Sequence, residues 1–131
     1  MSLLQSTATR RPPEGQAAAD RIRSMFEFVD TQDWDGLAQC FHDQIVYERP
    51  GYDPLVGKPA VLEFYRRIRV VSAGRHSIDR VLTDGEFIAC WGRFAGIAKD
   101  GRALRVGFAD VYGLEGMLIR SRRTFFDSPA I

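Results

Sequence analysis

The sequence has few of the residues that build metal sites and disulfide frameworks. Its 131 residues include two cysteines, Cys40 and Cys90, and two histidines, His42 and His76. The cysteines lack the close spacing of a zinc site and are too few for a disulfide framework. We therefore expect no metal site and no other cofactor.

Long apolar runs and one-sided charge are also absent. No apolar run approaches the roughly 18 residues that a membrane-spanning helix needs, and no secretory signal is visible, so we expect a cytoplasmic protein without a membrane partner. The net charge is +1. The one basic cluster, Arg120-Ser121-Arg122-Arg123, would divide between the two faces of a strand, and we expect no nucleic-acid partner.

The remaining composition is that of an ordinary globular protein, with 45% apolar and 27% charged residues. The length fits one domain with a substantial core. Residues 1–15 are polar and contain Arg10-Arg11-Pro12-Pro13, which predicts a flexible tail. Residues 16–131 are then expected to form a single domain.

Local patterns in the first half predict three helices and one strand. Apolar residues at three- and four-residue spacing predict a helix over residues 16–30. Asp33 can cap a short second helix over residues 34–41. A strand is expected over residues 44–49, and Pro59 lies at the start of a third helix.

Four strands joined by tight turns are expected between Arg75 and Asp127. Asp84-Gly85 and Asp100-Gly101 each lie between alternating apolar runs, a pattern typical of hairpins with two-residue type I′ loops. In the third turn we expect Gly116 to form a β-bulge. Helices followed by such a run of strands indicate an α+β domain, in which three N-terminal helices cover a cone-shaped, curved sheet of mixed or antiparallel strands.

The two Asp-Gly turns also set the predicted register. Counting outward from them pairs Trp91 with Asp110, and paired residues share one face of a sheet, as do residues two apart. One face is then expected to carry aromatic and ionisable side chains together: His76, Ile78, Trp91, Arg93, Phe108, Asp110 and Tyr112. This mixture is typical of a ligand cavity. The register of the last strand stays open, so the cavity faces either Arg120 and Arg122 or Ser121 and Arg123.

The other face of the predicted sheet has little polar cover. Its residues are Cys90, Gly92, Phe94, Gly107, Ala109 and Val111. A face of this kind is rarely left exposed to water. We therefore expect a homodimer built on the outer face of the sheet.

Three groups of residues resemble the motifs of a known superfamily. They are Phe41-His42-Asp43 with Val46-Tyr47-Glu48-Arg49-Pro50, then Gly57-Lys58-Pro59-Ala60-Val61 with Phe64-Tyr65, and Asp100-Gly101-Arg102 with Phe108-Ala109-Asp110-Val111-Tyr112 and Thr124-Phe125-Phe126-Asp127. On these motifs, the segment from about Ala17 to Asp127 resembles the nuclear transport factor 2-like superfamily, and within it the SnoaL-like polyketide cyclases and the ketosteroid isomerases. The resemblance implies a cystatin-like α+β cone. This fold hosts isomerases, cyclases, epoxide hydrolases and binding domains, so it leaves the reaction open.

The resemblance also implies roles for single residues. Asp110 matches the strand aspartate that acts as acid/base in SnoaL-like cyclases and that donates a hydrogen bond to the oxyanion in ketosteroid isomerases. Arg49 and Met25 stand where those isomerases keep a general-base aspartate and an oxyanion tyrosine, which argues against steroid isomerisation. Tyr47 and Arg49 match a Tyr-x-Asn pair of limonene epoxide hydrolases. The Asp-Arg-Asp triad of the hydrolases meets Trp91, Arg93 and Thr124 here, which argues against that chemistry.

Asp110 and His76 are the candidate catalytic residues. Beside Trp91 and Phe108, Asp110 would be partly desolvated, which raises its pKa toward neutrality. With His76 one row away, the two groups could move a proton during an aldol closure or a double-bond shift. Alternatively, Asp110 pairs with Arg93 or with an arginine of the last strand, which lowers its pKa and removes the base. The residues expected to contact the substrate are Trp91, Arg93, Phe108, Tyr112, Tyr47, Arg49, Met25 and Phe126.

Two functions follow from these patterns. The first is a cofactor-free acid/base enzyme, a cyclase or isomerase, that acts on a hydrophobic oxygenated small molecule such as a polyketide intermediate. The second is a non-catalytic small-molecule-binding or dimeric interaction domain of the same fold. An Asp110 that is open to the cavity and has no arginine partner favours the enzyme. A cone filled by Arg93, Trp91 and Arg122 favours the binding domain.

Overall fold

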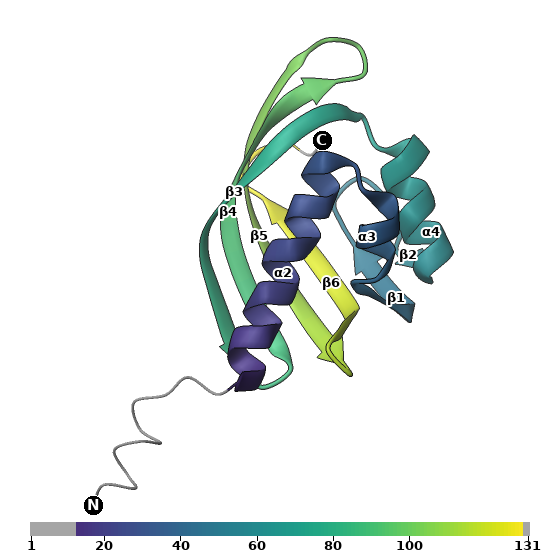
Figure 1. Ribbon diagram of the computed structural model, residues 1–131. Coiled ribbons are helices and arrows are strands. Elements are labelled where there is room, and N and C mark those ends of the chain that lie inside the picture. The colour runs from purple at the N-terminus through teal and green to yellow at the C-terminus, as the bar shows by residue number, and fades with distance from the viewer. Residues whose placement is uncertain (1–12, 130–131) are drawn as a thin grey trace, which may run out of the picture.

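The computed structural model describes residues 13–129 of the chain (Figure 1). The expected tail over residues 1–12 lies outside this part, whereas residues 13–15, also expected in the tail, already belong to a helix. The helical elements are α2 (Pro13–Thr31), α3 (Trp34–Ala38), α4 (Lys58–Glu63) and a π-helical turn that continues α4 (Phe64–Ile68). The strands are β1 (Phe41–Glu48), β2 (Leu55–Val56), β3 (Val71–Asp84), β4 (Phe87–Ala98), β5 (Ala103–Glu115) and β6 (Leu118–Phe126).

The six strands form one mixed sheet in the order β2-β1-β6-β5-β4-β3. β1 runs parallel to β6, and the other neighbouring strands are antiparallel. The sheet curls without closing, α2 crosses its concave side, and α4 lies beside β1 and β2 (Figure 1). The expected α+β cone, with helices packed over a curved sheet, is therefore confirmed.

The register of the β4–β5 hairpin differs by one residue from the predicted one. Its loop holds three residues, Lys99-Asp100-Gly101, and Gly101 has a φ of 88°. Three-residue hairpin loops commonly end in a left-handed residue of this kind, which glycine adopts without strain. Cys90 therefore pairs with Asp110, and the predicted pairing of Trp91 with Asp110 is wrong.

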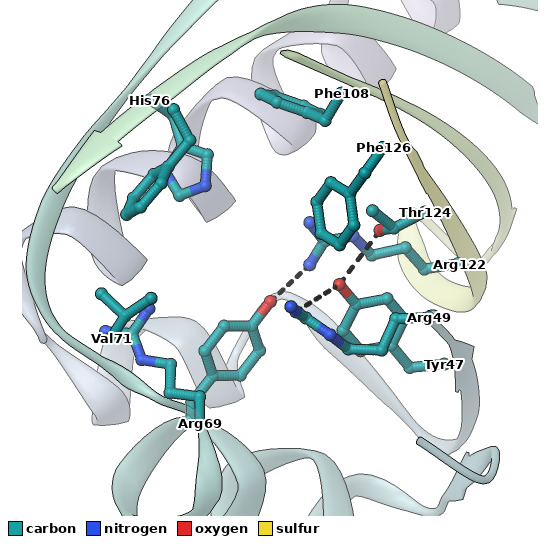
Figure 2. Close-up of a pocket in the computed structure, with 11 residues that line it drawn as sticks. Tyr47, Arg49, Arg69, Val71, His76, Phe108, Arg122, Thr124 and Phe126 are labelled. Carbon is teal, nitrogen blue, oxygen red and sulfur yellow. Dashed lines mark hydrogen bonds between the residues drawn. The ribbon is translucent and has the colours of Figure 1, made fainter. Parts of the chain in front are cut away.

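This one-residue difference exchanges the two faces of β4. Trp91 and Arg93 lie on the outer face, where Trp91 pairs with Ala109. Phe94, which the prediction places outside, faces inward and is buried. His76 and Phe108 face inward as predicted (Figure 2).

The β3–β4 hairpin has the expected two-residue loop, but the loop is Gly85-Glu86 rather than Asp84-Gly85. An irregularity after Ile78 then shifts the pairing by one residue, so that Ile78 pairs with Gly92. A Cβ atom at position 92 would lie 2.0 Å from the carbonyl oxygen of Ser77. The close approach of β3 therefore requires glycine at this position.

The turn between β5 and β6 also differs from the prediction. It is a two-residue loop, in which Gly116 has a φ of 58° and Met117 a φ of 65°. Two positive φ angles are typical of a type I′ hairpin. The irregularity in this pair of strands lies between Gly113 and Leu114 instead. The predicted bulge at Gly116 is therefore wrong.

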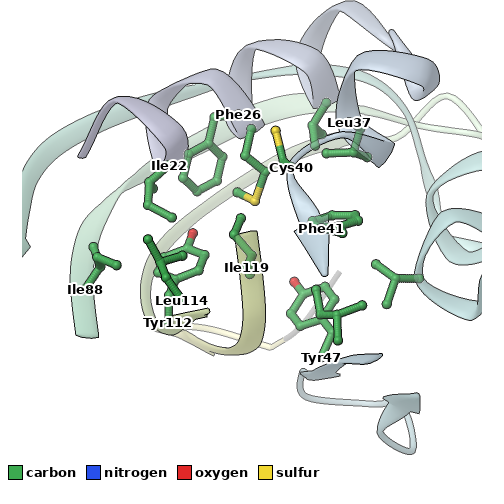
Figure 3. Close-up of a cluster of buried hydrophobic side chains, with 14 of the residues drawn as sticks. Ile22, Phe26, Leu37, Cys40, Phe41, Tyr47, Ile88, Tyr112, Leu114 and Ile119 are labelled. Atoms are coloured by element: carbon green, nitrogen blue, oxygen red, sulfur yellow. The ribbon is translucent and has the colours of Figure 1, made fainter. Parts of the chain in front are cut away.

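Most of the apolar core lies between α2 and the sheet (Figure 3). The periodic positions of α2 are each at most 3% exposed: Ala18, Ile22, Met25, Phe26 and Val29. Complete burial of a large apolar side chain contributes about 1.5–3 kcal/mol to folding. Cys40 and Cys90 are buried in the same core as free thiols. This core fixes α2 over the sheet and so sets the wall of the cone.

Candidate functional site

A cavity lies inside the cone, between the inner face of the sheet and the turn that follows α4 (Figure 2). Its volume is about 40 Å³, which is room for a few water molecules. Aromatic and cationic side chains dominate its lining: Tyr47, Arg49, Tyr65, Arg69, Val71, His76, Phe94, Phe108, Arg122, Thr124 and Phe126. Five of these are among the predicted site residues: Tyr47, Arg49, His76, Phe108 and Phe126.

His76 of β3, a predicted catalytic residue, is held at the cavity wall by Asp30 of α2. The Nδ1 atom of its ring lies 2.6 Å from Oδ1 of Asp30, and its backbone N–H donates to Oδ2 at 2.9 Å. A carboxylate only accepts hydrogen bonds, so Nδ1 carries the hydrogen and Nε2 keeps a lone pair. The ring borders the cavity (Figure 2), and no hydrogen bond to Nε2 occurs within residues 13–129. Nε2 is therefore available to a ligand.

Aromatic rings surround the imidazole of His76. The ring centroids of Phe26 and Phe94 each lie 4.7 Å from it, and that of Phe108 lies 5.6 Å away. Burial lowers the pKa of His76 below its ordinary value and outweighs the hydrogen bond that His76 donates to Asp30, which raises the pKa. The ring is therefore uncharged at neutral pH, the form that can accept a proton.

Asp110, the second predicted catalytic residue, is completely buried and forms an ion pair with Arg122 of β6. Nε and Nη2 of Arg122 donate to its Oδ2 at 3.1 and 2.9 Å. The hydroxyl of Tyr112 donates to the same oxygen at 2.5 Å, and that of Thr124 donates to Oδ1 at 2.6 Å. The sequence leaves open whether Asp110 is free or paired. In the structure it is paired, with Arg122 rather than Arg93.

Arg122 connects this ion pair to the cavity. Its Nη1 atom donates to the hydroxyl oxygen of Tyr65 at 2.5 Å. Burial alone would lower the pKa of Arg122, but Asp110 and the neighbouring tyrosines raise that pKa well above its ordinary value. Burial raises the pKa of Tyr65 to about 12 despite the nearby guanidinium. The phenol therefore keeps its hydrogen at neutral pH.

The number of hydroxyl hydrogens decides which group can donate into the cavity. Thr124 gives its hydrogen to Asp110, so Tyr47 is the donor in the 3.0 Å contact between the hydroxyls of Thr124 and Tyr47. Tyr47 in turn accepts from Nη1 of Arg49 at 3.1 Å. The hydrogen of Tyr65 has no acceptor in the part of the chain that the structure describes. A carbonyl oxygen of a ligand can take that place.

Four predicted substrate-binding residues do not line the cavity. Trp91 and Arg93 lie on the outer face of the sheet because the register differs by one residue. Trp91 is 41% exposed there. Met25 is buried in the core, and Tyr112 is buried beside Asp110. These four positions are corrections to the predicted site.

Several lining residues are absent from the predicted site: Tyr65, Arg69, Val71, Phe94, Arg122 and Thr124. Arg122 is one of the two alternatives that the undetermined register of the last strand leaves open. Phe94 is missing from the predicted site because the predicted β4–β5 register is wrong by one residue, which also misplaces Trp91. Asp30 lies 46 residues from His76, and no spacing rule connects an acidic residue on a helix to a histidine at that separation.

Within residues 13–129, no helix is long and apolar enough to span a membrane. No group of three or more histidine, cysteine, aspartate or glutamate residues in the same range is arranged to hold a metal ion.

Residues 22–122 match the family model of the SnoaL-like domain. Among curated proteins, no sequence matches this chain. An LEH-like epoxide hydrolase from M. tuberculosis has a similar structure, with a TM-score of 0.78 and 21% identity over 88% of this chain and 86% of that chain. For a provisionally assigned SnoaL-like polyketide cyclase from Jannaschia sp. CCS1, the TM-score is 0.79 with 14% identity over 91% of both chains. For a provisionally assigned ketosteroid isomerase from Kribbella flavida DSM 17836, the TM-score is 0.73 with 16% identity over 90% of this chain and 83% of that chain.

Proposed function

The chain belongs to the SnoaL-like domain family, and we propose that it is a cofactor-free enzyme that moves a proton on a small, hydrophobic, oxygenated molecule, as isomerases and cyclases do. The observation that carries this proposal is the His76–Asp30 pair, an oriented and neutral imidazole beside a cavity rich in aromatic rings. A polyketide intermediate is one substrate of this kind. The similarity of the fold to that of a provisionally assigned polyketide cyclase supports this substrate class.

In the proposed reaction, His76 is the base. Its Nε2 atom takes a proton from a carbon next to a carbonyl group, while Nδ1–H remains hydrogen-bonded to Asp30. The carboxylate stabilises the imidazolium that forms. The imidazolium then returns the proton, to another carbon in an isomerisation or to the oxygen of a newly closed ring in an aldol cyclisation.

Removal of the carbon proton leaves negative charge on the carbonyl oxygen, and Tyr65 can stabilise it. Its O–H group donates to that oxygen while it accepts a hydrogen bond from Arg122, which strengthens the donor. Donors that are oriented before the reaction are a major source of catalysis, and loss of one costs about 2.7–4 kcal/mol in comparable sites. Asp110 is then a positioning residue that holds Arg122, rather than the acid/base group that the family resemblance implies.

The alternative is a non-catalytic binding domain. Two features favour it: the cavity holds about 40 Å³, and the ion pair of Arg122 and Asp110 occupies the interior of the cone beside it. A ligand larger than a few water molecules must displace side chains to enter.

Proton exchange in deuterated water tests the enzyme without knowledge of its natural substrate. We would follow the α-proton signals of a panel of neutral hydrophobic ketones by NMR, with the parent protein, His76→Gln and His42→Gln. The parent is expected to accelerate exchange, and His76→Gln to reduce that rate about 10²–10⁴-fold. His42→Gln, the matched control at the other histidine, is expected to behave like the parent. Saturable binding without exchange of any ketone would favour the binding domain.

A further inference from the structure

Arg69 is a buried cation that lines the cavity and has no carboxylate partner within residues 13–129. It is 7% exposed, and its Nε atom has no hydrogen-bond partner among the residues that the structure describes. None of the ion pairs within residues 13–129 includes it. The rings of Trp34 and Tyr65 lie 5.7 and 5.4 Å from its guanidinium carbon. Buried charges are normally paired, because a charge removed from water needs a compensating partner.

The other charges around the cavity do not supply this partner. Asp110 forms an ion pair with Arg122. Asp30 raises the pKa of Arg69 through its charge, but its hydrogen bond is to His76. Arg49 adds a second positive charge at the wall. Burial and this neighbouring charge both lower the pKa of Arg69.

The turn after α4 brings Arg69 close to the proposed oxyanion donor. Phe64–Ile68 form a π-helical turn, and the N–H of Arg69 donates to the carbonyl oxygen of Phe64 at 3.0 Å. Turns of this type occur frequently at functional sites. Tyr65 lies in the same turn, and both side chains line the cavity. Figure 2 shows Arg69 at the cavity wall. A ligand bound at the Tyr65 hydroxyl therefore lies near a buried positive charge, because the guanidinium carbon of Arg69 is 5.4 Å from the Tyr65 ring.

We infer that the substrate of this cavity carries a carboxylate, which binds the guanidinium of Arg69 with Arg49 as a second cation nearby. The inference rests on the proposed function and names its substrate class, a keto acid whose carbonyl oxygen accepts a hydrogen bond from Tyr65. A guanidinium binds a carboxylate through two parallel N–H donors. The Nε–H of Arg69, which has no acceptor in the described part of the chain, can provide one of them.

Calorimetric titration with two probes of nearly equal shape tests this inference. We would compare benzoate with the neutral benzamide, using the full chain as the parent protein, Arg69→Gln, and Arg66→Gln as the control. Arg66 is the matched control because it belongs to the same turn but is exposed. The parent is expected to bind benzoate at least about tenfold more tightly than benzamide, a difference of about 1.4 kcal/mol in binding free energy. Arg69→Gln is expected to abolish that preference, and Arg66→Gln to retain it.

The controls separate this inference from the proposed function. Thermal melting establishes that Arg69→Gln is folded, and Arg69→Lys, which keeps the charge but not the planar donors, is expected to retain part of the preference. Equal binding of the two probes, a benzoate Kd above about 10 mM, or a preference that survives in Arg69→Gln would each overturn the inference. Exchange of neutral ketones that depends on His76 but comes without a benzoate preference overturns the carboxylate site alone. A benzoate preference without exchange of any ketone or keto acid supports the carboxylate site and contradicts the enzyme.

Discussion

The Nδ1 atom of His76 lies 2.6 Å from the Oδ1 atom of Asp30. This contact connects the edge strand β3 to the long helix α2, in a place where aromatic rings exclude most water. It gives the imidazole one tautomer and one orientation before any ligand arrives. The arrangement therefore predicts that activity depends on a residue that does not touch the substrate.

Replacement of Asp30 by Asn tests this dependence. The amide can turn its N–H group toward the ring, which favours the other tautomer and places a hydrogen on Nε2. Asp30→Asn is expected to reduce α-proton exchange about 10²–10⁴-fold with little change in benzoate affinity. Glu27→Gln, at an exposed position of the same helix, is the control. Exchange at the parent rate in Asp30→Asn would remove Asp30 from the mechanism.

The buried imidazole also predicts a pH dependence of stability. Burial lowers the pKa of His76 in the folded protein, so below its ordinary value of about 6.5 the unfolded chain binds more protons than the folded chain. The free energy of unfolding should therefore fall as the pH drops from about 7 to 5. Urea unfolding across this range should show a smaller fall for His76→Gln than for the parent. Identical slopes for the two proteins would contradict the lowered pKa.

The ion pair of Asp110 and Arg122 predicts a large effect on folding. Asp110→Asn leaves the guanidinium as an uncompensated charge at a fully buried site, and the free energy of unfolding should fall by about 3–5 kcal/mol. Urea unfolding measures this loss. The double variant Asp110→Asn/Arg122→Gln removes the uncompensated charge and is expected to regain part of the lost free energy of unfolding. A double variant whose loss equals the sum of the two single losses would show that the pair is not coupled.

The homodimer remains a prediction, and the exposed apolar residues on the outer face of the sheet indicate where its interface would lie. Large apolar side chains on this face are between 41% and 70% exposed: Leu82, Phe87, Trp91, Val111 and Phe125. Sedimentation at micromolar concentration should give a dimer for the parent and a monomer for Trp91→Glu. Ile68→Glu, which places the same charge at an exposed apolar position away from the sheet, should remain dimeric. A monomeric parent would refute the prediction.

The fold could be predicted largely because its signals are local. Asp33 caps α3 as expected, with its Oδ1 atom accepting from the N–H of Gly36 at 2.9 Å. The Asp-Gly pairs located both hairpins correctly but did not determine which residues form each loop, which are Gly85-Glu86 in the first and Lys99-Asp100-Gly101 in the second. In the second hairpin, the additional loop residue decides which face of the sheet Trp91 occupies.

The site could be predicted only in part because its contacts join distant segments. The sequence indicates that Asp110 points into the cone, but its partner depends on the register of β6. Arg122 and Tyr65 are 57 residues apart, and their hydrogen bond exists because α4 packs against β1, the neighbour of β6. No periodic pattern of apolar residues in the sequence predicts a contact between segments this far apart. Contacts at which several elements meet, such as that of Arg122 with Tyr65, could therefore not be predicted from the sequence.

The hydroxyl groups along one wall of the cavity donate in a single direction. Arg49 donates to Tyr47, Tyr47 to Thr124, and Thr124 to Asp110. Because each hydroxyl has one hydrogen, turning any of them around would leave its neighbour without a donor. The dipoles of the wall therefore add instead of cancelling, and every ligand meets the same electrostatic field. A field that is built into the fold needs no reorientation while charge moves in the reaction.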